Sequence, residues 1–153
     1  DYKRVRRPDD QIAPEIHYYA EPADQRRALI RSLGELKADK FENDEIVVLS
    51  PRADSMAIAG TVKDHPWCDR LRPMRSSPPG CIRYTTIQAF KGLESPAIVV
   101  TDIERIGDEA AKALFYVAIT RPLHRLTILV SESAKADLVS TLMQRASSRK
   151  MRS

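Results

Sequence analysis

The chain has 153 residues, 42% of them hydrophobic, which fits one globular domain with a single core. No apolar run approaches the roughly 20 residues that cross a bilayer, and the charged first residues contain no apolar signal segment, so we expect no membrane partner. Two cysteines are too few for a disulfide scaffold and indicate a cytoplasmic location. The net charge of +4 favours a polyanionic partner, although basic residues gathered at the two ends also suit solvated tails.

Strand-like and helix-like segments alternate along the chain. Short apolar runs predict strands at 15–20, 45–50, 81–87, 97–103 and 125–131. The segments between and after them predict helices at 22–39, 51–62, 107–120 and 133–146. The segment 65–80 contains four prolines and a glycine and is expected to be a loop.

This alternation predicts an α/β fold, in which helices sandwich a mostly parallel sheet. Ligands of such sheets bind beyond the carboxyl ends of the strands. We expect polar residues of three segments to meet on that edge and to form a site: Thr86, Gln88 and Lys91, then Asp102 and Glu104, then Thr120 and Arg121.

Two segments carry a resemblance to a known family. "YTTIQAFKGLES" (84–95) resembles motif V of superfamily I helicases of the UvrD/Rep type, T-x-H-x-x-K-G-L-E. "LFYVAITRPLHRLTILVS" (114–131) resembles their motif VI, Y-V-A-x-T-R-A followed by a strand. "EIVVLSPRADS" (45–55) is similar to the strand and loop that precede both motifs. Order and spacing agree, and the similarity spans 45–131.

The resemblance implies a RecA-like three-layer sandwich, the second of two motor domains that together form one ATPase. No P-loop pattern occurs in the chain. ATP with Mg²⁺ would be held mainly by the first RecA-like domain of the parent protein, so the chain alone should be inactive. Single-stranded DNA would be the other partner. We expect the domain at 15–145, a flexible basic segment at 1–14 and a basic tail at 146–153.

The family's motifs also imply roles for single residues. Arg121 takes the place of the motif VI arginine, which acts as an arginine finger on the transferring phosphoryl group. Glu94 matches the glutamate that contacts the nucleotide sugar, and Gly92 lets the backbone approach the ligand and tolerates positive φ. Lys91 either pairs with a rim carboxylate such as Asp102 or contacts a phosphate. We expect Thr120, the residue before Arg121, to bind the nucleotide as well.

On the same resemblance, Thr86 and Gln88 face the nucleic-acid strand. A hydroxyl and an amide that donate to phosphates position a strand without reading its bases. The chain departs from the family in three places. Gln88 replaces the usual histidine, and Pro122 and Leu123 replace an alanine and a basic residue. Only the segment 60–80 is available where UvrD-like enzymes insert an accessory domain.

Two other interpretations stay open. The chain could be a non-catalytic module that keeps the fold and binds nucleic acid or a protein through its basic ends. A zinc ion could be held by His65, Cys68 and Cys81, with His17 or His124 as a fourth ligand. That spacing fits no standard zinc pattern, so we expect no metal.

Overall fold

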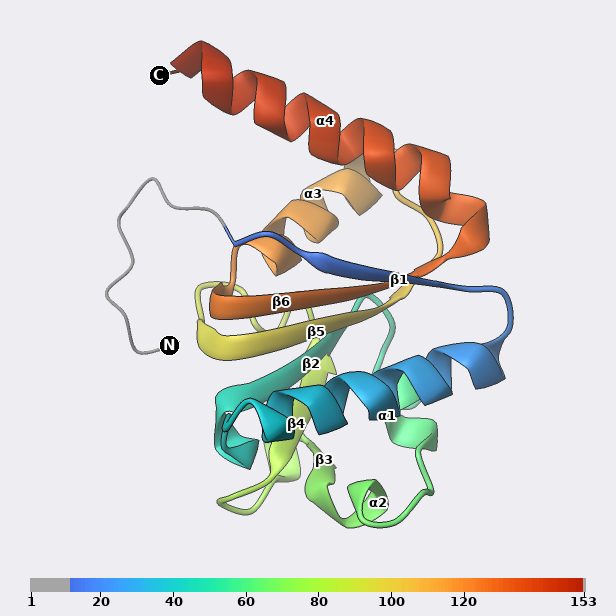
Figure 1. The fold of residues 1–153 in the computed structure, drawn as a ribbon, viewed down its shortest axis with the longest axis vertical. Coiled ribbons are helices and arrows are strands. Elements are labelled where there is room, and N and C mark those ends of the chain that lie inside the picture. The colour runs from blue at the N-terminus through green and yellow to red at the C-terminus, as the bar shows by residue number, and fades with distance from the viewer. Residues whose placement is uncertain (1–11, 153) are drawn as a thin grey trace.

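The computed structural model describes residues 12–152. All six strands are parallel and form one sheet in the order β1-β6-β5-β2-β4-β3 (Figure 1). The strands are β1 (Glu15–Tyr19), β2 (Ile46–Ser50), β3 (Leu71–Pro73), β4 (Ile82–Thr86), β5 (Ser95–Ile103) and β6 (Pro122–Ser131). The helices are α1 (Pro22–Ala38), the single-turn α2 (Trp67–Arg70), α3 (Glu109–Ile119) and α4 (Lys135–Arg152). Short 3₁₀ turns lie at Asn43–Glu45, Ile58–Thr61, Met74–Ser76 and Glu132–Ala134.

Both faces of the sheet are covered, which explains the continuous apolar runs of its central strands. In β2, Ile46 and Val48 pack into one hydrophobic cluster, while Val47 and Leu49 pack into the other. Successive side chains of a strand point to opposite faces, so a strand that is buried on both faces is apolar at every position. The apolar side chains of β2 therefore contribute alternately to the two clusters.

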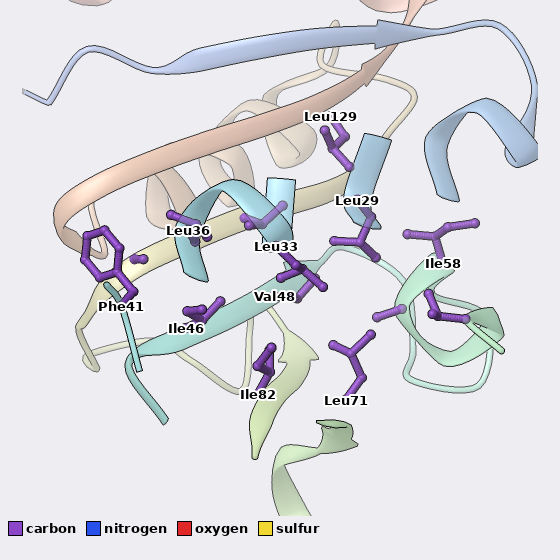
Figure 2. Packing of buried hydrophobic residues seen from close by; sticks show 14 of the residues in the cluster. Leu29, Leu33, Leu36, Phe41, Ile46, Val48, Ile58, Leu71, Ile82 and Leu129 are labelled. Atoms are coloured by element: carbon purple, nitrogen blue, oxygen red, sulfur yellow. The ribbon is translucent and has the colours of Figure 1, made fainter. Parts of the chain in front are cut away.

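Helices on the two faces complete a three-layer sandwich (Figure 1). Helix α1 places Leu29, Leu33 and Leu36 in the first cluster, where they meet residues of β2, β4 and β6 (Figure 2). On the opposite face, Phe115 of α3 and Leu138 of α4 pack in the second cluster. The α/β sandwich predicted from the sequence is confirmed.

The segment that follows β4 belongs to the second face as well. Ile87 and Phe90 are almost fully buried there, with exposed fractions of 1% each. The backbone N–H of Ile87 donates to the Ser50 carbonyl, and Phe90 N–H donates to the carbonyls of Thr86 and Ile87. Two buried side chains and these turns fix the path of residues 87–94, and the remaining side chains of that path face outward.

Two predictions of secondary structure were wrong. The predicted helix at 51–62 is mostly turns and ends in the 3₁₀ turn Ile58–Thr61. Its Ile58 N–H donates to the side chain of Asp102, which replaces a helical partner. The predicted loop at 65–80 contains α2 and the short strand β3. Because β3 is an edge strand, Pro73 lies at a position where a sheet tolerates proline.

The predicted domain boundaries stay predictions. Helix α4 continues without a break across residues 145 and 146, where the domain was expected to end and the tail to begin. Most of the predicted N-terminal segment, residues 1–11, lies outside the described residues. Among the described helices, none is both long and apolar enough to cross a membrane.

Candidate functional site

The candidate residues lie on two opposite edges of the sheet. Glu94 immediately precedes β5 and Arg121 immediately precedes β6, so both lie at the amino ends of parallel strands. Thr86 and Asp102 lie at the carboxyl ends of β4 and β5. The prediction that all three clusters share the carboxyl edge was wrong for Thr120 and Arg121. These two residues end a helix that leads into a strand, and such a helix returns the chain to the amino edge.

At the amino edge, the ends of the two helicase-like motifs are joined through Ser95. Its backbone N–H donates to the Arg121 carbonyl at 3.3 Å, and Ser95 pairs with Pro122 in the sheet register. Its hydroxyl donates to the Glu45 carbonyl at 2.7 Å, and the residue is 2% exposed. Ser95 therefore holds Glu94 and Arg121 side by side on adjacent strands. The sequence analysis missed this residue, although its place directly after K-G-L-E was the available signal.

The guanidinium of Arg121 rests on the residue before it. Thr120 caps the carboxyl end of α3, and its hydroxyl donates to the carbonyls of Tyr116 and Val117 at 3.1 and 2.9 Å. Nε and Nη2 of Arg121 donate to that same hydroxyl oxygen at 3.3 and 3.1 Å. A cation at a helix carboxyl end is also stabilised by the helix dipole. Arg121 is half-buried, and no carboxylate of the described residues forms an ion pair with it.

The residues that lead to Ser95 form an exposed turn. Lys91, Gly92, Leu93 and Glu94 are all exposed, with Leu93 46% exposed. Gly92 has φ of +80°, in the left-handed region where a side chain is disfavoured. A Cβ at this position would meet nothing within 4 Å, so the glycine is required by its backbone and not by crowding.

Replacing Gly92 with alanine should lower the free energy of unfolding by about 1 kcal/mol, because alanine is strained at positive φ. Gly80 provides a matched control, since it has φ of +85° and equally open surroundings but lies outside the motif. Urea denaturation of both variants should give similar losses. A loss confined to Gly92→Ala would show that this glycine has a packing role as well.

Thr86 and Gln88 lie where the same turn leaves β4. The Thr86 hydroxyl accepts a hydrogen bond from Ala89 N–H at 3.1 Å, which leaves its own proton free to donate. Gln88 is exposed, and its carbonyl accepts from Lys91 N–H at 3.3 Å. One turn thus presents a hydroxyl, an amide and an ammonium group to solvent.

Of the two roles considered for Lys91, pairing with Asp102 does not occur, because Asp102 is buried and bonded to other groups, and the phosphate contact stays a prediction. Asp102 is 3% exposed. Its Oδ1 accepts from Gln25 Nε2 at 3.2 Å. Its Oδ2 accepts from the hydroxyls of Ser50 at 2.7 Å and Thr101 at 2.9 Å, and from Ile58 N–H at 3.2 Å. The carboxylate therefore joins α1, β2, β5 and the turn at Ile58.

A bulge in β5 explains how Asp102 reaches these partners. Between the pairs Val100–Ile128 and Ile103–Val130, β5 advances three residues while β6 advances two. The extra residue places Asp102 at φ of +62°, and bulges of this kind re-aim a side chain. Asp tolerates the left-handed region better than most residues do.

The carboxyl edge carries a second polar chain outside this network. Arg52 Nη2 forms an ion pair with Glu104 Oε1 at 2.5 Å, and the Tyr19 hydroxyl donates to Glu104 Oε2 at 3.4 Å. Burial and then the negative charges of Glu104 and Asp102 raise the pKa of Tyr19, so its hydroxyl stays protonated. Cavities of about 380 and 270 Å³ flank this chain of groups, and Asp102, Glu104 and Arg52 line both. The charges of Arg52 and Glu104 are thus paired with each other within the domain.

Comparison with known proteins finds a solved structure with a similar fold. No protein family and no curated protein matches the sequence. A solved structure, the C-terminal domain of a possible DNA helicase from Lactobacillus plantarum WCFS1, is similar with a TM-score of 0.60 and 13% identity. The match covers 81% of this chain and 76% of that one. The two domains share a fold. Any further likeness depends on the residues of motifs V and VI.

Phe115 and Tyr116 of the second motif do not form a base-stacking platform. Phe115 is 2% exposed and belongs to the second cluster. Tyr116 is half-buried; its hydroxyl donates to the Thr141 carbonyl at 3.4 Å, and the Arg145 guanidinium lies 5.8 Å from its ring centroid. These contacts tie α3 to α4 and support the position of Arg121 at the end of α3.

Proposed function

We propose that this chain is the second RecA-like motor domain of an ATP-dependent superfamily I DNA helicase or translocase. The observation that carries the proposal is the hydrogen bond from Ser95 N–H to the Arg121 carbonyl. It places the last residues of both helicase-like motifs on one edge of the sheet, where Glu94 and Arg121 are neighbours. The fold shared with the helicase domain from Lactobacillus plantarum supports the proposal.

The two neighbours supply complementary chemistry for a nucleotide that is held mainly by a first domain. Arg121 offers fixed guanidinium donors to phosphate oxygens, and its charge persists at any physiological pH. Thr120 positions that guanidinium through its hydroxyl. The Glu94 carboxylate accepts hydrogen bonds from ribose hydroxyls, while Lys91 and the backbone at Gly92 lie on the exposed turn beside it. Mg²⁺ would be bound with the triphosphate by the first domain.

Single-stranded DNA is proposed to bind the outward side of the motif V turn. Thr86 and Gln88 donate uncharged hydrogen bonds to phosphates, which fix a strand without reading its bases. Ile87 and Phe90 are buried on the other side of the turn and hold it rigid. The turn therefore joins a DNA contact at β4 to a nucleotide contact at β5 through one short segment.

The double substitution Thr86→Ala with Gln88→Ala should weaken binding of single-stranded DNA by the parent protein to a similar degree for all base sequences. Neither change removes a charge, so the dependence of affinity on salt should stay the same. Thr86→Ser is the matched control, because it keeps both the hydrogen bond to Ala89 and the free donor. Fluorescence anisotropy of labelled oligonucleotides at several salt concentrations measures both quantities.

A second set of substitutions distinguishes the motor from a binding module that depends on its basic end. Replacing Arg149, Lys150 and Arg152 with glutamine should reduce the salt slope by up to about 2 units, about 0.7 for each true phosphate contact. Arg145 is left unchanged because it packs on Tyr116. If these three changes remove all binding and the motif V pair changes nothing, the turn does not touch DNA and the module is favoured.

A further inference from the structure

A group of metal-ligating side chains lies at the opposite end of the sheet from Arg121. Cys68 and Asp69 lie in the single turn α2, and His65 lies just before it. Helix α2 lies beside the edge strand β3 (Figure 1). One imidazole nitrogen, the Cys68 sulfur and one Asp69 oxygen all lie within 4.8 Å of one another. Neither motif V nor motif VI includes these residues.

The backbone holds the three side chains together. Cys68 N–H donates to the Asp64 carbonyl at 2.9 Å, and Asp69 N–H donates to the Pro66 carbonyl at 3.1 Å. Between them, Trp67 packs against the first hydrophobic cluster and anchors the turn to the domain. His65 precedes the helical turn, and the anchored turn holds Cys68 and Asp69 beside it.

Two arginines lie near the group, and neither forms an ion pair with Asp69 in the described part of the chain. The Arg70 guanidinium lies 5.3 Å from the centroid of the Trp67 ring. Arg72 Nη1 donates to the carbonyls of Cys68 at 2.7 Å and Leu71 at 3.0 Å. Asp69 instead faces the imidazole of His65, with Nδ1 and Oδ2 3.6 Å apart.

We infer that His65, Cys68 and Asp69 form a binding site for a zinc-class divalent cation. Imidazole, thiolate and carboxylate are the three ligand types of Zn²⁺, whereas Mg²⁺ and Ca²⁺ prefer oxygen ligands throughout. The side chains of His65 and Asp69 are 82% and 69% exposed, so water can fill the remaining coordination position. Such an open site has three protein ligands.

This arrangement differs from the zinc site that the sequence left open. Cys81, His17 and His124 do not belong to the group, and Asp69 takes the third position. His124 lies on β6, which three strands separate from β3, and His17 lies on β1, which four strands separate from β3. The inference is independent of the proposed motor function, because it uses no residue of the nucleotide or DNA contacts.

Titration of the metal-free, untagged chain with Co²⁺, a spectroscopic substitute for Zn²⁺, tests the site. Binding should produce the near-ultraviolet charge-transfer absorption of a cobalt–thiolate bond, and added Zn²⁺ should remove it. Cys68→Ser should abolish this absorption, whereas Cys81→Ser, the matched control at the other half-buried free cysteine, should keep it. His65→Ala and Asp69→Asn should each weaken binding at least about tenfold.

Three results would overturn the inference. The wild-type chain could show no thiolate absorption at saturating Co²⁺. The absorption could persist in Cys68→Ser, which would place the metal elsewhere. His65→Ala and Asp69→Asn could both bind Co²⁺ as tightly as the wild type, which would mean that His65 and Asp69 are not metal ligands and that the Cys68 thiol binds the ion without them. Circular dichroism of each variant, whose changes are at a surface turn, should confirm an unchanged fold.

Discussion

Replacing Arg121 with alanine in the full-length parent should lower the rate of ATP turnover by roughly 10³–10⁵ while leaving ATP affinity nearly unchanged. An arginine finger acts on charge that develops as the phosphoryl group transfers, so its loss affects the transition state far more than the bound ground state. Steady-state phosphate release with single-stranded DNA present gives the turnover, and equilibrium titration with nucleotide gives the affinity.

Matched variants make this test specific. Arg105→Ala removes another exposed arginine, but from the loop after β5 at the carboxyl edge, and should leave turnover near the wild-type value. Arg121→Lys keeps a positive charge but lacks the planar fork, so most of the loss should remain. Thr120→Ser keeps the hydroxyl that supports the guanidinium and should be far milder than Thr120→Val. Equal, small losses of turnover and affinity in Arg121→Ala would show that Arg121 is not the finger.

The sequence predicted most of the fold because local patterns determine it. Strand β2 is apolar at its first four positions, and α1 repeats its leucines at helical spacing, so both were located within a few residues. The three-residue strand β3 was missed, since its short length and the prolines of the surrounding segment 65–80 indicate a loop, and only its pairing with β4 makes it a strand. Edge strands depend on their neighbour more than on their own residues.

The candidate site was predictable in its residues but not in its arrangement. The motifs identified Glu94 and Arg121, whereas their proximity follows from the sheet register, in which the next residues along the chain, Ser95 and Pro122, are paired. The buried network of Asp102 was also missed. Gln25 is 77 positions away from Asp102 in sequence, and the bulge that turns Asp102 inward has no local signature. Contacts between residues so far apart in the sequence depend on the order of the strands in the sheet, and no short sequence motif predicts that order.

Asp102→Ala should destabilise the chain by roughly 3 kcal/mol or more, since each buried donor left without a partner costs about 1–3 kcal/mol. The substitution removes the acceptor for Gln25, Ser50 and the Ile58 N–H at once, while the Thr101 hydroxyl keeps the Leu49 carbonyl as an acceptor. Asp108→Ala is the reference for an ordinary carboxylate contact, because Asp108 caps the exposed start of α3, and should cost about 1 kcal/mol. Urea denaturation with an unchanged m-value measures both losses.

Two further substitutions at Asp102 separate the network from the strain of its backbone. Glycine adopts φ of +62° freely, so Asp102→Gly should exceed Asp102→Ala in stability by about 1 kcal/mol while still losing the network. Asparagine tolerates the same φ and retains one oxygen, which can face the three donors at Oδ2 while its amide opposes Gln25 Nε2. Its loss should therefore be intermediate. If Asp102→Gly proved as stable as the wild type, strain and not hydrogen bonding would dominate at this bulge, and the carboxylate would not be what joins α1 to the sheet.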